Sequence, residues 1–249
     1  MVDLHCHILP AIDDGSTSWE ETSEMCRIAA QDGVLHIVAT PHANHKYSYD
    51  REYFEPMRQR LQATCGHLLN FSLGCDFHLS YENIEDALRH PRRYTIANSN
   101  YLLVEFNDFS LMPVIRQGIF RLVSGGIIPI VTHPERNPVL LDRHEKVLEL
   151  IDCGCLIQVT ASSFTGHWGE RPQQMAEWLL LRDAVHVVAS DAHDTRHRPP
   201  VLSAAYERVR ILTNKSVAQT LFVDNPGAIV SAEPPIQREV PPPGSPVDR

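Results

Sequence analysis

The strongest constraint on the fold is an alternation of short apolar segments with helical patterns. Seven apolar, β-branched runs recur along the 249 residues, and a helical pattern follows each of them. The runs cover Val2–Leu9, Val34–Thr40, Phe71–Phe77, Tyr101–Phe106, Ile127–Thr132, Cys155–Thr160 and Val185–Ser190. Runs that are apolar on both faces are typical of strands covered on two sides. The alternation therefore predicts a parallel sheet with right-handed crossovers.

The segments between these runs carry helix signals of their own. Ser18 and Glu21 have the spacing of a capping box, which predicts a helix that starts there and ends at Gly33. Further helices are expected over Phe54–Leu68, Tyr81–His90, Pro113–Gly125, Leu141–Cys153 and Gln173–Arg182, and from Pro199 onward. So many strand–helix units in a chain of this length favour a closed barrel, and an open sheet is the alternative.

The end of the chain differs in composition from the rest. The last 17 residues, Glu233–Arg249, contain six prolines and almost no large apolar side chain. Proline removes backbone donors and favours extended polyproline II, so we expect a disordered tail over 233–249. The sequence thus predicts a single-domain barrel over residues 1–232.

Composition excludes several classes of protein. The formal net charge of −9 gives no overall field that would attract nucleic acid or an anionic membrane. No apolar stretch is long enough to span a bilayer, and the first residues do not have the pattern of a signal peptide. The six cysteines are therefore interpreted as reduced thiols in a cytoplasmic protein, with no membrane insertion and no nucleic-acid partner expected.

Metal-ligand side chains stand at the ends of six of the predicted strands, in a chain with 14 histidines. They are His5, His7, His42, Asp76, His78, Glu105, His133, Asp191 and His193, and Asp13 and Asp14 follow in the first loop. In an α/β barrel the carboxyl ends of all strands form one mouth, so these residues converge. Neutral imidazoles and carboxylates suit Zn²⁺, Mn²⁺ or Fe²⁺, and carboxylates can bridge two ions.

An alternative interpretation is that these residues have structural roles and bind no metal. A lone histidine on a strand is more often a buried, hydrogen-bonded residue than a ligand, and Trp19, Trp168 and Trp178 are interpreted as packing residues. Buried carboxylates without partners are costly, however, and six strand ends of one chemical type are hard to explain by packing. The set as a whole therefore predicts a metal centre.

Two arginines near the predicted mouth suggest the substrate. Arg136 follows His133 closely, and Arg198 follows His193. Guanidinium groups bind phosphate bidentately and keep their charge at neutral pH. No P-loop and no Gly-x-Gly-x-x-Gly motif is present. Metal ligands together with arginines point to hydrolysis of phosphate esters.

The motifs around these residues resemble those of the polymerase and histidinol phosphatase (PHP) superfamily. They are Asp3-Leu4-His5-Cys6-His7, Asp13-Asp14-Gly15, Ala39-Thr40-Pro41-His42, Leu103-Val104-Glu105-Phe106, His133-Pro134-Glu135-Arg136 and Ala189-Ser190-Asp191-Ala192-His193. More narrowly, the chain from Met1 to about Ala232 is similar to the bacterial PHP-type protein-tyrosine phosphatases of capsule and exopolysaccharide operons, the CpsB/YwqE-like group. The resemblance implies a distorted (β/α)7 TIM-like barrel.

The resemblance also implies a site with two or three divalent metal ions, usually Mn²⁺, with Fe²⁺, Zn²⁺ or Co²⁺ as alternatives. One ion takes His5, His7, Asp76 and Asp191. A second shares Asp76 and takes Glu105 and His133, and a third takes Asp14, His42 and His193. Arg136 and Arg198 hold the substrate phosphate. The family usually has Glu where this chain has Asp76, a side chain shorter by one carbon.

The activity implied by the resemblance is hydrolysis of phosphotyrosine on a bacterial tyrosine autokinase. A metal-bridging hydroxide attacks the phosphate, Arg136 and Arg198 stabilise its charge, and Asp191 is a candidate proton carrier. Three alternatives stay open: a PHP phosphatase for a small metabolite such as histidinol phosphate, a nuclease, and a catalytically silent binding module. In the last case the Pro241–Pro243 run would serve as a partner's ligand.

Overall fold

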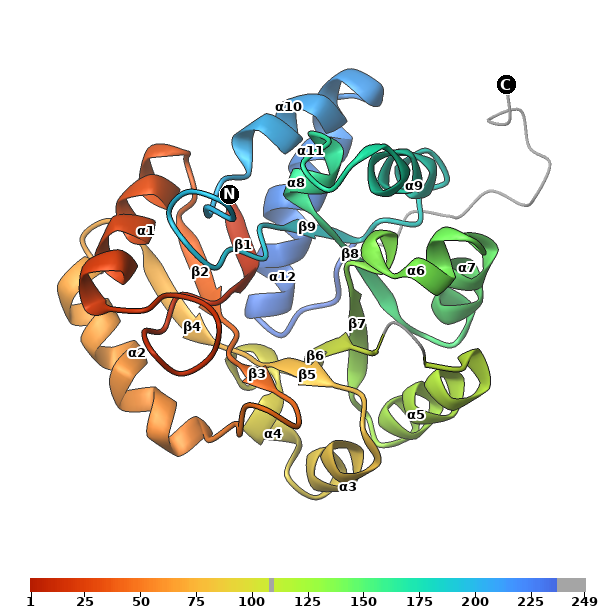
Figure 1. The fold of residues 1–249 in the computed structure, drawn as a ribbon, viewed down its shortest axis with the longest axis horizontal. Helices are drawn as coiled ribbons and strands as arrows, with labels where there is room; N and C mark the ends of the chain where they lie inside the picture. Colours follow the sequence, from red (N-terminus) through yellow and green to blue (C-terminus); the bar gives the residue numbers. More distant parts are fainter. Residues whose placement is uncertain (108–109, 237–249) are drawn as a thin grey trace.

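Strands surrounded by helices form one α/β domain in the computed structural model (Figure 1), which describes residues 1–107 and 110–236. Each of the seven predicted apolar runs contains or overlaps a strand, one of them overlaps two, and a further short strand follows the second run. The strands are β1 (Val2–Cys6), β2 (His36–Ala39), β3 (His42–Ala43), β4 (Asn70–Leu73), β5 (Asp76–His78), β6 (Tyr101–Glu105), β7 (Ile128–Thr132), β8 (Leu156–Thr160) and β9 (Val187–Ala189). The predicted α/β class and the single domain are confirmed.

All strand pairs are parallel, and the strands follow the order in the sequence. One sheet has the order β1-β2-β4, and the other has the order β3-β5-β6-β7-β8-β9. β2 is separated from β3 by Thr40 and Pro41, where proline cannot donate a ladder hydrogen bond. At the other end, Cys6 pairs with Ala192, and the His7 amide donates to the Ala192 carbonyl (2.8 Å). These bonds connect the first strand to the segment that follows the last one.

The helices form the outer layer of the domain. They are α1 (Trp19–Gln31), α2 (Arg51–Cys65), α3 (Tyr81–Arg89), α4 (Pro91–Tyr94), α5 (Met112–Ser124), α6 (Pro138–Leu141), α7 (Glu145–Asp152), α8 (Ala161–Phe164), α9 (Glu170–Leu181), α10 (Ser203–Leu212), α11 (Lys215–Gln219) and α12 (Asn225–Val230). Ser18 caps α1 as predicted, because its hydroxyl accepts the Glu21 amide (3.2 Å). The last long helix starts at Ser203 instead of Pro199, because Asp32 accepts the amides of Leu202 (2.6 Å) and Ser203 (2.9 Å) there.

Two apolar clusters stabilise the domain. Alternate strand residues such as Leu4, Leu103 and Ile130 fill the space between the strands, together with Ile96 and Ile229. The larger cluster lies between strands and helices. This alternation follows from the period of two along a strand, and it leaves the strand ends free for polar side chains.

The segment after α12 lies against the domain. Tyr101 donates to the Glu233 carbonyl (3.1 Å), and the Asn225 side chain accepts the Ile236 amide (2.7 Å). The predicted tail boundary at residue 233 therefore falls within an attached stretch, and residues 237–249 lie outside the described residues. Within the described part of the chain, no helix combines the length and the apolar character needed to span a membrane.

Candidate metal centre

The nine predicted ligands lie together at the carboxyl ends of the strands. Three sets of side chains each offer ligand atoms within 4.8 Å of one another: His7, Asp14, His42 and His193; His5, His7 and Asp76; and His42, Asp76 and Glu105. The remaining two predicted ligands, His133 and Asp191, lie beside these sets. His133 Nε2 lies 3.8 Å from Glu105 Oε1, and Asp191 Oδ1 lies 3.4 Å from His5 Nε2.

The strands explain why these residues meet. β3 pairs with β5 so that His42 stands beside Asp76, and β5 pairs with β6 so that His78 stands beside Glu105. His133 (φ 35°), the first residue after β7, and Asp191 (φ 53°), the second residue after β9, both have left-handed backbone conformations. Such conformations are unfavourable for non-glycine residues and are often found at functional sites. They turn both side chains toward the shared opening.

The ring nitrogens of the histidines are oriented by neighbouring acceptors. His7 Nδ1 donates to Asp13 Oδ2 (2.8 Å), and His193 Nδ1 donates to the Asp191 carbonyl (3.0 Å). A carboxylate and a carbonyl can only accept, so the proton of each neutral ring sits on Nδ1. The Nε2 lone pairs are left for a metal ion, which is the arrangement that outer carboxylates usually impose on ligating histidines.

His5 and His7 face each other inside this arrangement. Their Nε2 atoms lie 3.2 Å apart, and His5 Nδ1 lies 3.0 Å from Gln158 Oε1. Burial lowers the pKa of His7 to about 4, so this ring is neutral at pH 7. Burial opposes protonation of His5 as well, but the Asp191 and Asp76 carboxylates outweigh it and raise the pKa of His5 to about 9. The two carboxylates thus stabilise a positive charge at His5 Nε2, where either a proton or a metal ion can supply it.

Asp76 lies between the ligand sets. Its Oδ2 atom is 3.6 Å from His5 Nε2, 4.0 Å from His7 Nε2 and 3.0 Å from His42 Nδ1. Asp76 Oδ1 is buried without a hydrogen-bond partner in the described residues. Buried polar atoms are rarely left in this state. The donor set and this unpaired oxygen fit a cluster of divalent ions, with Asp76 shared between sites.

The Asp76 carboxylate also affects Glu105. Burial, followed by the nearby charge of Asp76, raises the pKa of Glu105 to about 8. Two carboxylates that repel each other in a buried site are stabilised when a cation lies between them. This electrostatic pattern again matches a metal centre.

Two arginines contact the centre through one carboxylate. Arg136 and Arg198 both donate to Oδ2 of Asp191, whose Oδ1 faces His5. Arg136 belongs to the short helix Pro134–Arg136 that follows β7, and Arg198 belongs to the loop after β9. The arrangement therefore places two guanidinium groups directly beside the metal ligands, where they can bind an anion.

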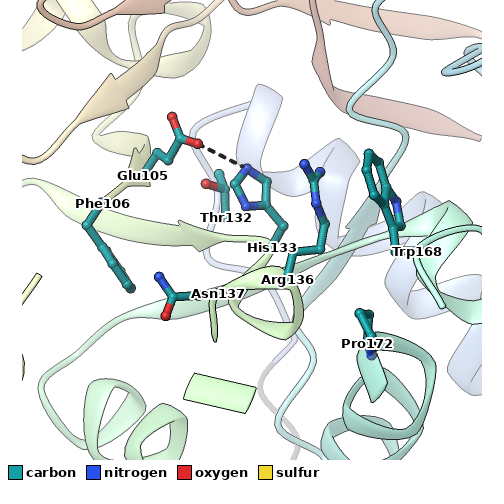
Figure 2. Close-up of a pocket in the computed structure, with 8 residues that line it drawn as sticks. All are labelled: Glu105, Phe106, Thr132, His133, Arg136, Asn137, Trp168 and Pro172. Carbon is teal, nitrogen blue, oxygen red and sulfur yellow. Dashed lines mark ion pairs between the residues drawn. The ribbon is translucent and has the colours of Figure 1, made fainter. Parts of the chain in front are cut away.

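A cavity of about 380 Å³ opens next to the ligands (Figure 2). Its lining combines Glu105, His133 and Arg136 with the apolar surfaces of Phe106, Trp168 and Pro172. A hydrophobic cavity of about 150 Å³ is enough to hold benzene, so this space can take an aromatic ring. Its position beside Arg136 suits the organic part of a phosphate ester.

Several residues of the site have roles that were not predicted from the sequence. Asp13 was considered as a possible ligand, but it orients His7 and also accepts the His42 amide (3.2 Å). Gln158 was detectable as a polar residue within an apolar strand. Phe106 and Trp168 gave no signal, because aromatic residues are common in cores. His78, a candidate ligand, is absent from the three ligand sets found among the described residues.

The sequence matches the family described as capsular polysaccharide synthesis, CpsB/CapC, over residues 1–231. It is 34% identical over 210 residues to the putative tyrosine-protein phosphatase CapC of Staphylococcus aureus, covering 83% of this chain and 82% of CapC. It is 31% identical over 241 residues to the tyrosine-protein phosphatase CpsB of Streptococcus pneumoniae, covering 92% of this chain and 98% of CpsB.

Solved structures agree with these relatives. One match belongs to a study of YwqE from Bacillus subtilis and CpsB from Streptococcus pneumoniae, described as metal-dependent tyrosine phosphatases. Its TM-score is 0.87 at 27% identity, with 96% of this chain and 97% of that chain covered. Histidinol phosphate phosphatase from Lactococcus lactis shares the fold at a TM-score of 0.60 and 11% identity, with 87% of this chain and 93% of that chain covered.

Fold, ligand set and relatives together define the class of protein: a single-domain α/β hydrolase that depends on metal ions. Within this class, the chain belongs to the CpsB/CapC family. The resemblance found in the sequence is thereby confirmed.

Proposed function

We propose that the protein is a metal-dependent protein-tyrosine phosphatase that acts on the phosphotyrosine of a bacterial tyrosine autokinase in the control of capsule or exopolysaccharide synthesis. The observation that carries this proposal is the position of Asp191, which faces the metal ligand His5 with one oxygen and both arginines with the other. A phosphoryl group beside Asp191 would contact metal ions and guanidinium groups together. The family relatives that are named tyrosine phosphatases support the choice of substrate.

The ligand sets support two or three divalent ions, for which we propose Mn²⁺, with Fe²⁺, Zn²⁺ and Co²⁺ as alternatives. His5, His7, Asp76 and Asp191 would hold one ion, and Glu105 and His133 a second that shares Asp76. Asp14, His42 and His193 would hold a third. Bound ions supply Lewis acidity for the phosphoryl oxygens and lower the pKa of water toward neutrality.

The protein's own groups bind and orient the phosphate. Arg136 and Arg198 present planar, permanently charged donors that match phosphoryl oxygens and stabilise the charge that redistributes during transfer. Both now donate to Asp191, so we assign to this carboxylate the orientation of the arginines. Its two oxygens are engaged on both sides, which makes it a poor proton donor. A tyrosine leaving group, with a pKa near 10, needs little protonation to depart.

The aromatic ring of the substrate has a suitable place in the cavity of about 380 Å³ between Phe106, Trp168 and Pro172. Small alkyl phosphates without a ring would leave these apolar walls unfilled. This feature favours an aryl phosphate over such substrates, and the experiment below separates it from histidinol phosphate, which carries an imidazole ring. The net charge of −9 gives no support for the nuclease alternative.

We also propose that the protein works in the cytoplasm. All six cysteines are free thiols, and five of them are buried. This state is typical of proteins that fold in a reducing compartment.

The experiment that tests the proposed activity compares three substrates in the presence of Mn²⁺: a phosphotyrosine peptide, histidinol phosphate and single-stranded DNA. We expect turnover of the peptide, its loss in EDTA and its return with Mn²⁺. Faster turnover of histidinol phosphate or DNA would favour the corresponding alternative. Full activity in excess chelator would contradict the metal mechanism, and failure to bind metal or turn over any substrate would favour a silent binding module.

A further inference from the structure

We propose that Trp168 is a positioning residue that holds Arg136 and Arg198 in the orientation in which they bind the phosphoryl group. This inference rests on the proposed phosphatase function. Trp168 lies in the loop between α8 and α9, and it belongs to none of the metal-ligand sets found in the described residues.

Both guanidinium groups lie over the same indole ring. The Cζ atom of Arg136 is 3.9 Å from the ring centroid of Trp168, and the Cζ atom of Arg198 is 5.5 Å from it. A cation within about 6 Å of an aromatic face is attracted to it, and tryptophan gives the strongest attraction. Figure 2 shows the Arg136 and Trp168 side chains next to each other at the cavity. One indole thus binds both arginines, although they follow different strands.

The indole is itself fixed in place. Its Nε1 donates to Ser162 Oγ (2.8 Å), and its ring makes an edge contact with His167, with ring centroids 5.0 Å apart. Ser162 lies on α8, which follows β8 directly. A hydrogen bond at one edge leaves the face of the ring free for the arginines.

Packing alone does not account for Trp168. Trp19 and Trp178 pack against the main apolar core cluster, and Trp168 is not among the residues that do so. It is half-buried and lines the cavity beside the metal ligands. Of the three tryptophans, it is therefore the one whose contacts are directed to the site.

An aromatic face suits this task because it uses none of the arginine donors. A guanidinium group has five N–H donors, and a carboxylate partner occupies some of them. Stacking on the indole fixes the plane of the guanidinium and leaves every N–H available. Arg136 and Arg198 can then bind the phosphate with the N–H groups that Asp191 does not occupy, while Asp191 and the indole together hold their orientation.

The test compares Trp168→Phe with Trp168→Leu, since both side chains are apolar and one of them has an aromatic face. The inhibition constant for inorganic phosphate is measured alongside kcat/KM for p-nitrophenyl phosphate. We expect Trp168→Leu to weaken phosphate inhibition and to lower kcat/KM by about tenfold relative to the wild type. We expect Trp168→Phe to stay within about threefold of the wild type. The matched control is Trp178→Phe, at an indole that stacks on Arg182 (4.2 Å), and its kinetics should not change.

A double-mutant cycle separates positioning from general stability. If Trp168 acts through Arg136, the effect of Trp168→Leu should shrink to about threefold or less in an Arg136→Ala background, because coupled residues are not additive. Bound Mn²⁺ and the Tm should be unchanged by the Trp168 variants.

Three results would overturn the inference: equal behaviour of the Phe and Leu variants, additive effects in the cycle, or a loss confined to aryl substrates with unchanged phosphate inhibition. The last result would make Trp168 a contact for the leaving group. Each of these three results can be interpreted only if the wild-type protein is an active phosphatase. Loss of all phosphatase activity in the wild type would instead overturn the proposed function.

Discussion

His7 Nδ1 lies 2.8 Å from Asp13 Oδ2, so a residue outside the three candidate ligand sets of the described residues fixes the proton of His7. With that proton on Nδ1, His7 Nε2 presents a lone pair toward His5 Nε2 at 3.2 Å. Two ring nitrogens at this distance require a proton or a metal ion between them. The Asp13–His7 pair thus selects the protonation state that favours metal binding.

The first prediction concerns this pair. Asp13→Ala should weaken Mn²⁺ binding by about 10- to 100-fold, the usual cost of losing an acceptor behind a ligating histidine. The dissociation constant is measured by competition with a chelator of known affinity. The surface variant Asp142→Ala serves as a control, because Asp142 is 70% exposed and contacts only Arg171 among the interactions described for it. Unchanged affinity in Asp13→Ala would remove the assigned role.

The second prediction concerns Asp76, the carboxylate shared between ligand sets. Asp76→Asn keeps the shape of the side chain and removes its charge, so we expect the loss of at least one equivalent of metal and most of the activity. Asp76→Glu should retain both, since it keeps the carboxylate and its charge. Metal is counted by elemental analysis of the purified proteins. Full metal content in Asp76→Asn would show that this carboxylate is not a bridge.

The convergence of the candidate ligands could be predicted because parallel strands place all their carboxyl ends on one side. Most candidates, from His5 to His193, stand at the end of an apolar run, and Asp14 lies in the loop after the first run. The short strand β3 after the second run, and the division of the third run into β4 and β5, were not predicted. Pro41 lacks the N–H donor that would continue the ladder, and it separates β2 from β3.

Other features depend on contacts between distant segments. The start of α10 at Ser203 is set by Asp32, which lies 171 residues earlier. The role proposed for Trp168 depends on two arginines from other loops, and a tryptophan in a sequence carries no sign of such neighbours. Local patterns identify strands and ligands, whereas the partners of loop side chains are determined by the tertiary fold.

The third prediction concerns substrate choice. Phe106 is 8% exposed and lines the cavity beside Arg136. Phe106→Ala should lower kcat/KM for a phosphotyrosine peptide about tenfold, because a ring in the cavity would lose an aromatic neighbour. It should change the slower hydrolysis of an alkyl phosphate such as glycerol phosphate by less than about threefold. An equal decrease in kcat/KM for both substrates would mean that Phe106 stabilises the structure of the site and does not discriminate in favour of an aromatic substrate.

The fourth prediction concerns stability against pH, away from the metal ligands. His186 is buried beside β8, and its Nδ1 accepts the Ile157 amide (3.1 Å). Burial lowers the pKa of His186 to about 4, whereas a histidine in the unfolded chain has a pKa near 6.5. As the pH falls below about 6.5, the unfolded chain binds a proton that the folded chain does not. The contribution of neutral His186 to the free energy of unfolding is therefore fully present above about pH 6.5, and it decreases progressively as the pH falls to about 4.

His186→Asn is the variant that isolates this effect, because its amide oxygen can accept the Ile157 amide and does not titrate. Between pH 7 and pH 5, the wild type should lose about 2 kcal/mol more of its free energy of unfolding than the variant. Urea denaturation of each protein at pH 7 and at pH 5 gives the change in its free energy of unfolding between the two pH values. The metal ligands titrate in both proteins, so their contribution cancels when the variant is subtracted from the wild type. Parallel pH profiles of the two proteins would show that the pKa of His186 is not lowered by the fold.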